Sequence, residues 1–339
     1  MEPTYNCISL FDGISATYLG LQRAGIKIDK YFSSEIEPNA LKVQKHHHGN
    51  SPNFIQLGDV RNVQGSQFPT NYDIVFSFGF PCLDLSIIKK NREGLTGPQS
   101  SLFYEALRIL KELKRHLEGT GKQIYFIAEN VASMTSSDKQ AILEHLQEVY
   151  PETYVINIDS KLVSASRRNR LYFTNIPGIE QPEDLGIKLS EIIENGFVDR
   201  DKSRAVLSSN VTLYKSGLKR HLTMGVGTVI YCSESFSKKS TEDKLAIYPK
   251  LLEASGYEGK PNKESLELDF PNGVYRLPSI KEYCRLMTFP DNYLDIPQVS
   301  TTAKVKLLGL SMTVGVMQHI LNFIPSELQQ NTNHKLNQS

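Results

Sequence analysis

The chain has 339 residues, a net charge of +1 and 40% hydrophobic residues, enough to bury a sizeable core in one large domain or two of ordinary size. No apolar run reaches about 18 residues, which excludes a membrane span, and no signal peptide begins the chain. The cysteines lie far apart without metal-ligand spacing, which predicts a reduced intracellular protein; they are Cys7, Cys82, Cys232 and Cys284.

Seven short apolar runs alternate with amphipathic stretches over the first 176 residues. The runs are 6–11, 30–34, 53–57, 72–78, 123–128, 154–158 and 170–174. Apolar residues at helical spacing predict helices at Ser101–His116 and Asp138–Val149. The alternation predicts an α/β fold with a doubly wound, mostly parallel, seven-stranded sheet, which binds ligands beyond the carboxyl ends of its strands.

The pattern changes near residue 178. From there to residue 275 the chain is richer in Gly, Ser and Lys, and helical segments return at Ser279–Met287 and Thr313–Phe323. We predict a first domain at 1–177, a smaller inserted domain at 178–275, a return to the first domain at 276–326 and a disordered tail at 327–339.

Acidic residues follow the first three predicted strands. The turn that contains Asp12 is rich in small residues, which lets a ligand approach the backbone closely. Glu35 can accept hydrogen bonds from both hydroxyls of a ribose, and Asp59 can accept one from an adenine amino group. Acids after strands are often only helix caps. Three of them in order at one sheet edge nevertheless favour an adenosine pocket.

The next strands end in residues that suit covalent catalysis. Cys82 follows the fourth strand in Gly79-Phe80-Pro81-Cys82, and a basic, Gly-containing loop comes after it. A lone cysteine is usually a small buried hydrophobe, but this position lies at the ligand-binding edge. Glu129 ends the fifth strand and would project beside Cys82. Arg168 and Arg170 have the spacing of residues on one face of a strand, so we expect both to point into one cleft.

These motifs resemble, in order, those of the DNA (cytosine-5)-methyltransferases. The resemblance rests on Phe11-Asp12-Gly13, on Gly79-Phe80-Pro81-Cys82, on Glu129-Asn130-Val131, on Arg168-x-Arg170 and on the closing element Gly309–Val314. It covers about 5–177 and 275–324. In detail the chain is most similar to the de novo branch, in compact form without accessory chromatin-reading domains. A compact bacterial or phage enzyme, with a role in restriction-modification, is the alternative.

The resemblance implies S-adenosylmethionine as methyl donor, S-adenosylhomocysteine as product, no metal, and double-stranded DNA as substrate. It implies that Cys82 adds to carbon 6 of a flipped-out cytosine, Glu129 binds N3 and the exocyclic amine, and Arg170 binds O2. Arg168 would orient the neighbourhood of Cys82 and Glu129. The donor contacts that it implies are Phe11, Asp12, Gly13, Glu35, Ile36, Asp59, Val60, Pro81, Leu102 and Ser311. Core packing is the alternative role for Phe11, Ile36, Val60 and Leu102.

Three residues depart from the family pattern. Leu83 replaces the usual Gln or Asn after the cysteine, Ser166 replaces the Gln of Gln-x-Arg-x-Arg, and Leu310 replaces the Asn of the closing element. None of these residues makes or breaks a bond in the reaction. The departures weaken any transfer of base-pair specificity from the family.

The inserted stretch at 178–275 stands where the family has its target-recognition domain. Within it, residues 200–250 contain ten Lys/Arg and four Asp/Glu, an excess that could face a polyanion; an ordinary solvated surface is the alternative. We expect a monomer on DNA, with an oligomer left open. The expected location is the cytoplasm or nucleoid in a bacterium or phage host and the nucleus in a eukaryote.

Three other functions compete with DNA methylation. A tRNA cytosine methyltransferase would use the same chemistry, but the insert of about one hundred residues favours a duplex groove. A catalytically dead regulatory homologue would be expected to lack Cys82, Glu129 or the arginine pair. A nicotinamide oxidoreductase would need a glycine fingerprint that this turn does not have. The clustered residues His46, His47 and His48 point in different directions on a helix, so we do not expect them to share a metal.

Overall fold

The computed structural model describes residues 3–81, 102–206, 221–223, 227–246 and 275–325. The chain forms two compact units. Unit 1 comprises 1–159, 169–182 and 311–339, and unit 2 comprises 160–168 and 183–310. Cys82 and the basic residues Lys215, Lys219 and Arg220 lie outside the described residues, as do the predicted loop after Cys82 and the predicted tail.

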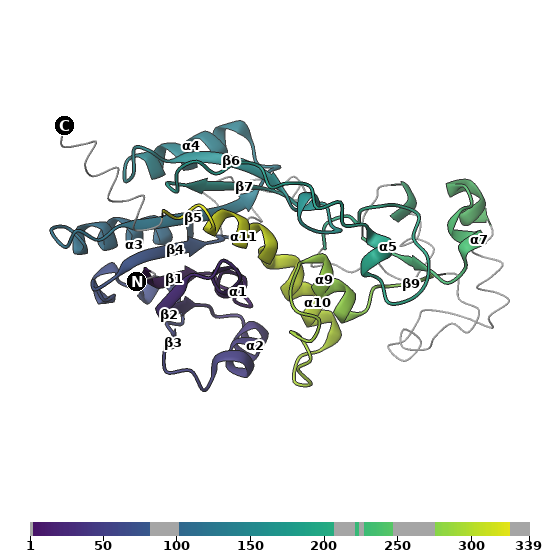
Figure 1. Ribbon diagram of the computed structural model, residues 1–339, viewed down its shortest axis with the longest axis horizontal. Helices are drawn as coiled ribbons and strands as arrows, with labels where there is room; N and C mark the ends of the chain where they lie inside the picture. The colour runs from purple at the N-terminus through teal and green to yellow at the C-terminus, as the bar shows by residue number, and fades with distance from the viewer. Residues whose placement is uncertain (1–2, 82–101, 207–220, 224–226, 247–274, 326–339) are drawn as a thin grey trace. The chain divides into compact units, whose positions relative to one another are not determined.

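Unit 1 contains a seven-stranded sheet (Figure 1). The strand order is β3-β2-β1-β4-β5-β7-β6, and every pairing is parallel except those of β7. The predicted mostly parallel, doubly wound sheet is therefore confirmed. The strands are β1 (Thr4–Leu10), β2 (Lys27–Ser34), β3 (Phe54–Gln56), β4 (Asp73–Phe78), β5 (Ile124–Val131), β6 (Tyr154–Asp159) and β7 (Asn169–Thr174).

Helices accompany the strands of unit 1. They are α1 (Ala16–Arg23), α2 (Pro38–His48), α3 (Leu102–His116), α4 (Ser136–Gln147) and α11 (Val314–Leu321), with short 3-10 turns at Val60–Asn62 and Gly65–Gln67. Three of these helices correspond to predicted segments. Helix α4 begins where it does because the Thr135 side chain accepts a hydrogen bond from the Asp138 backbone N–H.

The two faces of the sheet have different partners. Alternate residues of β4 such as Phe76 and Phe78 join one apolar cluster with Phe103 and Leu110 of α3. Helix α1 packs against α11, and the two are so close that a Cβ on Gly20 would lie 2.9 Å from Cβ of Met317. Helices on both faces bury the central strands completely, and this leaves the carboxyl ends of the strands as the place for a ligand.

The described part of unit 2 has little regular structure. It contains β8 (Ile230–Tyr231) paired antiparallel with β9 (Tyr275–Arg276), a 3-10 turn at Ser160–Leu162, and the helices α5 (Leu189–Ile192), α7 (Glu234–Ser237), α9 (Ile280–Leu286) and α10 (Thr301–Leu310). Helix α9 was predicted, whereas α10 was not. Unit 2 extends to Leu310, so the chain returns to unit 1 at Ser311 and not at the predicted residue 276. No helix among the described residues is long and apolar enough to cross a membrane.

Candidate active site

The turn after β1 has an unusual backbone. Phe11 and Ser15 have φ of 55° and 61°, and Gly13 between them has φ of 58°. Positive φ is uncommon for residues with a side chain, and it costs free energy that the surrounding structure must offset. Such conformations cluster at ligand sites. The turn lies at the carboxyl end of β1, where the sequence predicts the donor.

The buried carboxylate of Asp12 is the centre of a hydrogen-bond network in this turn. It is 8% exposed, and its carboxylate accepts hydrogen bonds from the Tyr31, Ser33 and Ser15 hydroxyls at 2.7–3.0 Å and from Nε2 of Gln44 at 3.0 Å. Burial raises the pKa of Asp12, and the hydrogen bonds to it act in the opposite direction. Because four hydrogen bonds fix this carboxylate, we infer that Asp12 holds the turn in shape.

Glu35 ends β2 beside the same turn. One carboxylate oxygen accepts a hydrogen bond from the Gly13 N–H at 2.7 Å, and the other accepts from the N–H groups of Ile36 and Glu37, also at 2.7 Å. Burial raises the pKa of Glu35, although these backbone hydrogen bonds oppose the shift. The carboxylate is thereby fixed in orientation, and its remaining lone pairs can accept from ribose hydroxyls.

Ile36 exposes an apolar side chain next to this carboxylate. It is 61% exposed, the largest value among the exposed large hydrophobic residues of the described chain. An exposed apolar side chain beside a fixed carboxylate suits a nucleoside, because the base can cover the one while the ribose binds the other. The residues therefore fit the adenosine part of S-adenosylmethionine.

The other expected donor contacts divide into core and surface residues. Val60 is buried, while Phe11 and Leu102 are partly buried against the apolar cluster, so these three also pack the core. Asp59 caps the turn at 60–62 and forms an ion pair with Arg61, whose hydrogen bonds lower the pKa of that carboxyl. The chain before Asp59 is tied to β2, because the Ser34 hydroxyl donates to the Gly58 carbonyl at 2.7 Å. Pro81 is half-buried and Ser311 is buried, both in unit 1.

Glu129 and Arg170 lie together near the carboxyl end of β5. Residues 129 and 131 share a face with residues 170 and 172 across the β5–β7 pairing. Oε1 of Glu129 lies 2.9 Å from Nε of Arg170, and the two side chains are 11% and 18% exposed. The two groups are not aligned for a hydrogen bond, so among the described residues this buried oxygen has no hydrogen-bond partner. A buried carboxylate oxygen that has this ion pair but no hydrogen-bond partner among the described residues suits a ligand that donates a hydrogen bond to it.

Asn130 connects this carboxylate to the loop that carries Cys82. Its Nδ2 donates to the Phe80 carbonyl at 3.2 Å, and its Oδ1 accepts from the Val131 N–H at 2.8 Å. The side chain is 1% exposed, so both hydrogen bonds are shielded from water. They fix the backbone two residues before Cys82, which itself lies outside the described residues.

Gly79 makes room on the same loop. A Cβ at this position would lie 3.4 Å from Oε2 of Glu129 and 2.9 Å from Cε of Met312. The loop after β4, the end of β5 and the segment that follows Ser311 therefore meet at one place in unit 1.

The two arginines of the Arg168-x-Arg170 motif fall in different units of the chain. Arg170 lies in β7, but Arg168 precedes β7, which begins at Asn169, and belongs to unit 2. Nη1 of Arg168 donates to the Gly309 carbonyl at 3.0 Å, near the carboxyl end of α10. A guanidinium there is favoured by the helix dipole. The Ser160 N–H donates to the Arg168 carbonyl at 3.1 Å, which continues the pairing beside β7. The expectation that both arginines point into one cleft stays a prediction.

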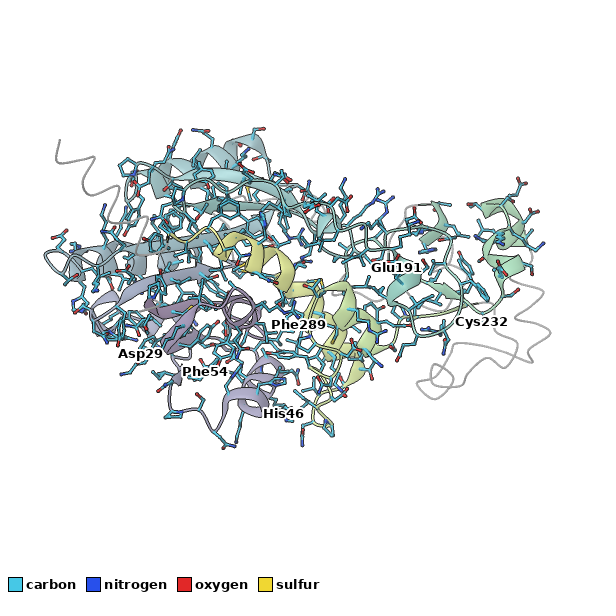
Figure 2. The ribbon with its side chains drawn as sticks, in the orientation of Figure 1. Asp29, His46, Phe54, Glu191, Cys232 and Phe289 are labelled. Atoms are coloured by element: carbon cyan, nitrogen blue, oxygen red, sulfur yellow. The ribbon has the colours of Figure 1, made fainter. Side chains whose placement is uncertain are left out.

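The three consecutive histidines behave separately. His48 is buried, stacks on Phe54 at 4.3 Å between ring centroids, and has its pKa lowered to about 4, chiefly by burial. Figure 2 labels His46 on α2 and Phe54 on β3. Among the described residues, no group of three His, Cys, Asp or Glu side chains has the arrangement of a metal site.

Sequence reasoning missed Asn130 as a positioning residue, together with the partners of Asp12. The signal for Asn130 was its place in the motif Glu129-Asn130-Val131, next to the strand end that faces the Cys82 loop. Tyr31, Ser33 and Gln44 gave no local signal, because they reach Asp12 from 19 to 32 residues away.

The sheet order, the strained turn after β1 and the fixed carboxylate of Glu35 fit an S-adenosylmethionine-dependent methyltransferase. The C-5 cytosine-specific DNA methylase family matches residues 5–326. The chain belongs to this family, and it is a DNA cytosine-5 methyltransferase that uses S-adenosylmethionine. The family membership excludes a nicotinamide oxidoreductase.

Individual proteins agree with this assignment. The chain is 27% identical to the type II methyltransferase M1.ScrFI of Lactococcus lactis subsp. cremoris, over 93% of this chain and 77% of that protein. It is 24% identical to the type II methyltransferase M.NgoPII of Neisseria gonorrhoeae, over 96% and 98%. Among solved structures, the Entamoeba histolytica methyltransferase EhMeth has the same fold, with a TM-score of 0.65 and 15% identity over 96% of this chain and 98% of that one.

Proposed function

We propose that this enzyme methylates a cytosine flipped out of duplex DNA through a covalent adduct on Cys82, with Glu129 and Arg170 as the groups that bind the base. The observation that carries the proposal is the buried oxygen of Glu129, which has no hydrogen-bond partner among the described residues and lies 2.9 Å from Arg170. A cytosine offers the exocyclic amine and, once protonated, N3 as donors to such an oxygen.

The reaction is difficult because carbon 5 of cytosine is a poor nucleophile. The Cys82 thiolate adds to carbon 6, and the electron pair of the 5,6 double bond moves toward carbon 5 and the N3–O2 side of the ring. Glu129 supports protonation at N3, and Arg170 stabilises the charge that develops at O2. After methylation at carbon 5, loss of the carbon-5 proton to a base and departure of the thiolate restore the aromatic ring.

The donor supplies an electrophilic methyl group on a sulfonium. Glu35 would hold its ribose, Ile36 and Phe11 would cover its adenine, and Asp59 would accept from the adenine amino group. Asp12 and Gly13 would act through the shape of the turn, and Val60, Pro81, Leu102 and Ser311 would complete the pocket. Arg168 would act through unit 2, where its described hydrogen bond lies.

A base inside a duplex cannot reach a nucleophile on a sheet edge, so the target must leave the helix at a cost of a few kcal/mol. Residues 178–275 would read the flanking sequence, because the sheet edge is taken up by donor and base. The similarity to two type II methyltransferases supports a role in restriction-modification for this chain as well. We expect a monomer on DNA.

Mapping of 5-methylcytosine tests the proposal. DNA and tRNA are isolated from cells that lack cytosine methylation and express either the wild type or Cys82→Ala. The proposal predicts methylated cytosines in duplex DNA, at one defined sequence context, with the wild type only. Methylation confined to tRNA would overturn the choice of substrate, and no methylation of either would favour a regulatory homologue.

A further inference from the structure

Two segments of unit 2 are joined through a pair of buried serines. Ser166 and Ser203 form an isolated parallel bridge, in which the Arg167 N–H donates to the Ser203 carbonyl at 3.0 Å and the Ser203 N–H donates to the Ala165 carbonyl at 2.7 Å. Both serines are 0% exposed, and the Ser203 hydroxyl donates to the Arg204 carbonyl at 2.6 Å. The backbone on either side of the bridge is therefore held firmly.

The residue after each bridged serine is an exposed arginine. Arg167 and Arg204 line one hollow of about 320 Å³ together with Asp199, Arg200, Asp201 and Lys202. Four of these side chains are cationic and two are acidic, so the hollow carries an excess of positive charge.

Three of the other four charged side chains of the hollow are already engaged within the protein. Nε of Arg200 donates to Asp199 at 2.8 Å, and Nζ of Lys202 donates to the carbonyls of Lys161 and Ser164 at 2.7 and 3.0 Å. Within the described parts of the chain, neither Arg167 nor Arg204 forms an ion pair with a carboxylate. Asp201 is the acidic side chain of the hollow that remains to oppose them.

We propose that Arg167 and Arg204 together bind a backbone phosphate of the DNA substrate. The inference rests on the proposed function and adds a surface to it. Two guanidiniums that line one hollow repel each other, and an anion between them removes that repulsion. The planar fork of arginine matches phosphate oxygens, and phosphate contacts outnumber base contacts in protein–DNA interfaces.

The position of Arg167 in the chain agrees with a phosphate near the target base. Three peptide units separate it from Arg170, so the two Cα atoms are at most about 11 Å apart. A phosphate close to the flipped nucleotide is thus within reach of Arg167 while Arg170 contacts the base.

Ser166 lets the two segments that carry the arginines lie close together. The residue stands where the family usually has Gln, and its hydroxyl lies 3.4 Å from that of Ser203. A longer side chain at this fully buried position would push the second segment away, and Arg204 with it.

Salt-dependent DNA binding tests the proposal. The variants are Arg167→Gln, Arg204→Gln and their combination, and the matched control is Lys306→Gln, which removes an exposed cation of α10 that does not line the hollow. Fluorescence anisotropy on two 30-bp duplexes, one with and one without a methylated sequence, gives Kd at several salt concentrations. Melting temperature and affinity for S-adenosylhomocysteine are measured alongside.

Each single variant is expected to weaken binding to both duplexes equally and to reduce the slope of log Kd against log salt by about one, and the double variant by about two. The control, the melting temperatures and the donor affinity should stay at wild-type values. Slopes equal to those of the wild type and of Lys306→Gln would overturn the proposal. A loss of affinity confined to the duplex with the methylated sequence would also overturn it, because such a loss indicates base readout. A loss of binding to an RNA hairpin without any change for DNA would overturn it as well. Methylation of DNA by the wild type is scored separately, so a failure of the proposed function would be recognised by itself.

Discussion

Substitution of Glu35 by Ala tests two expected roles of this residue, which are to stabilise the turn after β1 and to bind the ribose of the donor. In the structure its carboxylate accepts three backbone hydrogen bonds at 2.7 Å, of which the one from Gly13 is partly buried and the one from Ile36 is exposed. Water can replace the carboxylate at Ile36 but less easily at Gly13, so we expect about 1–3 kcal/mol of lost folding stability. Loss of the ribose contact should cost a further ~1–3 kcal/mol of donor binding, about 5- to 150-fold in Kd.

A cycle with a modified ligand isolates the ribose contact. Calorimetry compares S-adenosylhomocysteine with its 2′-deoxy analogue, on the wild type and on Glu35→Ala. The missing hydroxyl should weaken binding to the wild type, whereas the variant should bind both ligands alike. The control is Glu37→Ala, which removes the neighbouring carboxylate that caps α2 and should leave both affinities unchanged. An equal penalty for the missing hydroxyl in the wild type and in Glu35→Ala would refute the assignment of Glu35 to the ribose.

Three further outcomes are expected. Burial raises the pKa of Glu35, and only the ionised carboxylate accepts hydrogen bonds well. The affinity for the donor should therefore fall as the pH is lowered, and the fall should begin above the pH range in which an ordinary Glu is protonated. Glu35→Gln should flatten this pH profile when binding is measured by calorimetry. Asn130→Ala should lower kcat at least tenfold in a tritium-transfer assay with donor affinity unchanged, because the Phe80 carbonyl loses its donor; equal losses of kcat and donor affinity would contradict a role at the loop. Burial alone would raise the pKa of Asp199, but the His221 ring at 3.6 Å and the hydrogen bonds from Arg200 and Tyr231 outweigh it and hold this pKa well below its ordinary value. A carboxyl whose pKa is lower in the folded than in the unfolded protein stabilises the fold at pH values above its unfolded-state pKa. Asp199→Asn should therefore lower Tm at neutral pH, and the difference in Tm between wild type and variant should shrink below about pH 4. A Tm difference that does not depend on pH would contradict this.

The fold was predictable because buried parallel strands have a strong sequence pattern. Each of the seven predicted strands is present, most with shifts of one to three residues at their ends, since runs such as Tyr72–Phe78 are apolar on both faces and are bounded by polar turns. Helix α10 escaped prediction because its apolar residues do not gather on one side.

Site residues were predictable only where a residue type that suits the chemistry stands at the end of a predicted strand. Glu129 and Arg170 form an ion pair because β5 and β7 pair antiparallel where these residues stand, and chain order alone indicates that both lie near the carboxyl end of β5. The interior support of the site was not predictable. The hydrogen bonds of Asp12 and the cluster around Asp199 join residues far apart in the chain, and no local pattern records such pairs. The shared cleft expected for Arg168 and Arg170 stays a prediction, because the two residues belong to different units.

Covalent trapping tests the central claim most directly. A duplex that carries 5-fluorocytosine at the methylated position is incubated with enzyme and S-adenosylmethionine, and the product is analysed by intact mass and peptide mapping. Fluorine at carbon 5 cannot leave as a proton would, so the thiolate stays attached. The account predicts a stable protein–DNA adduct on the peptide that contains Cys82, absent in Cys82→Ala and slower to form in Glu129→Gln. An adduct that persists in Cys82→Ala, or none with a wild type that methylates the unmodified duplex, would contradict it.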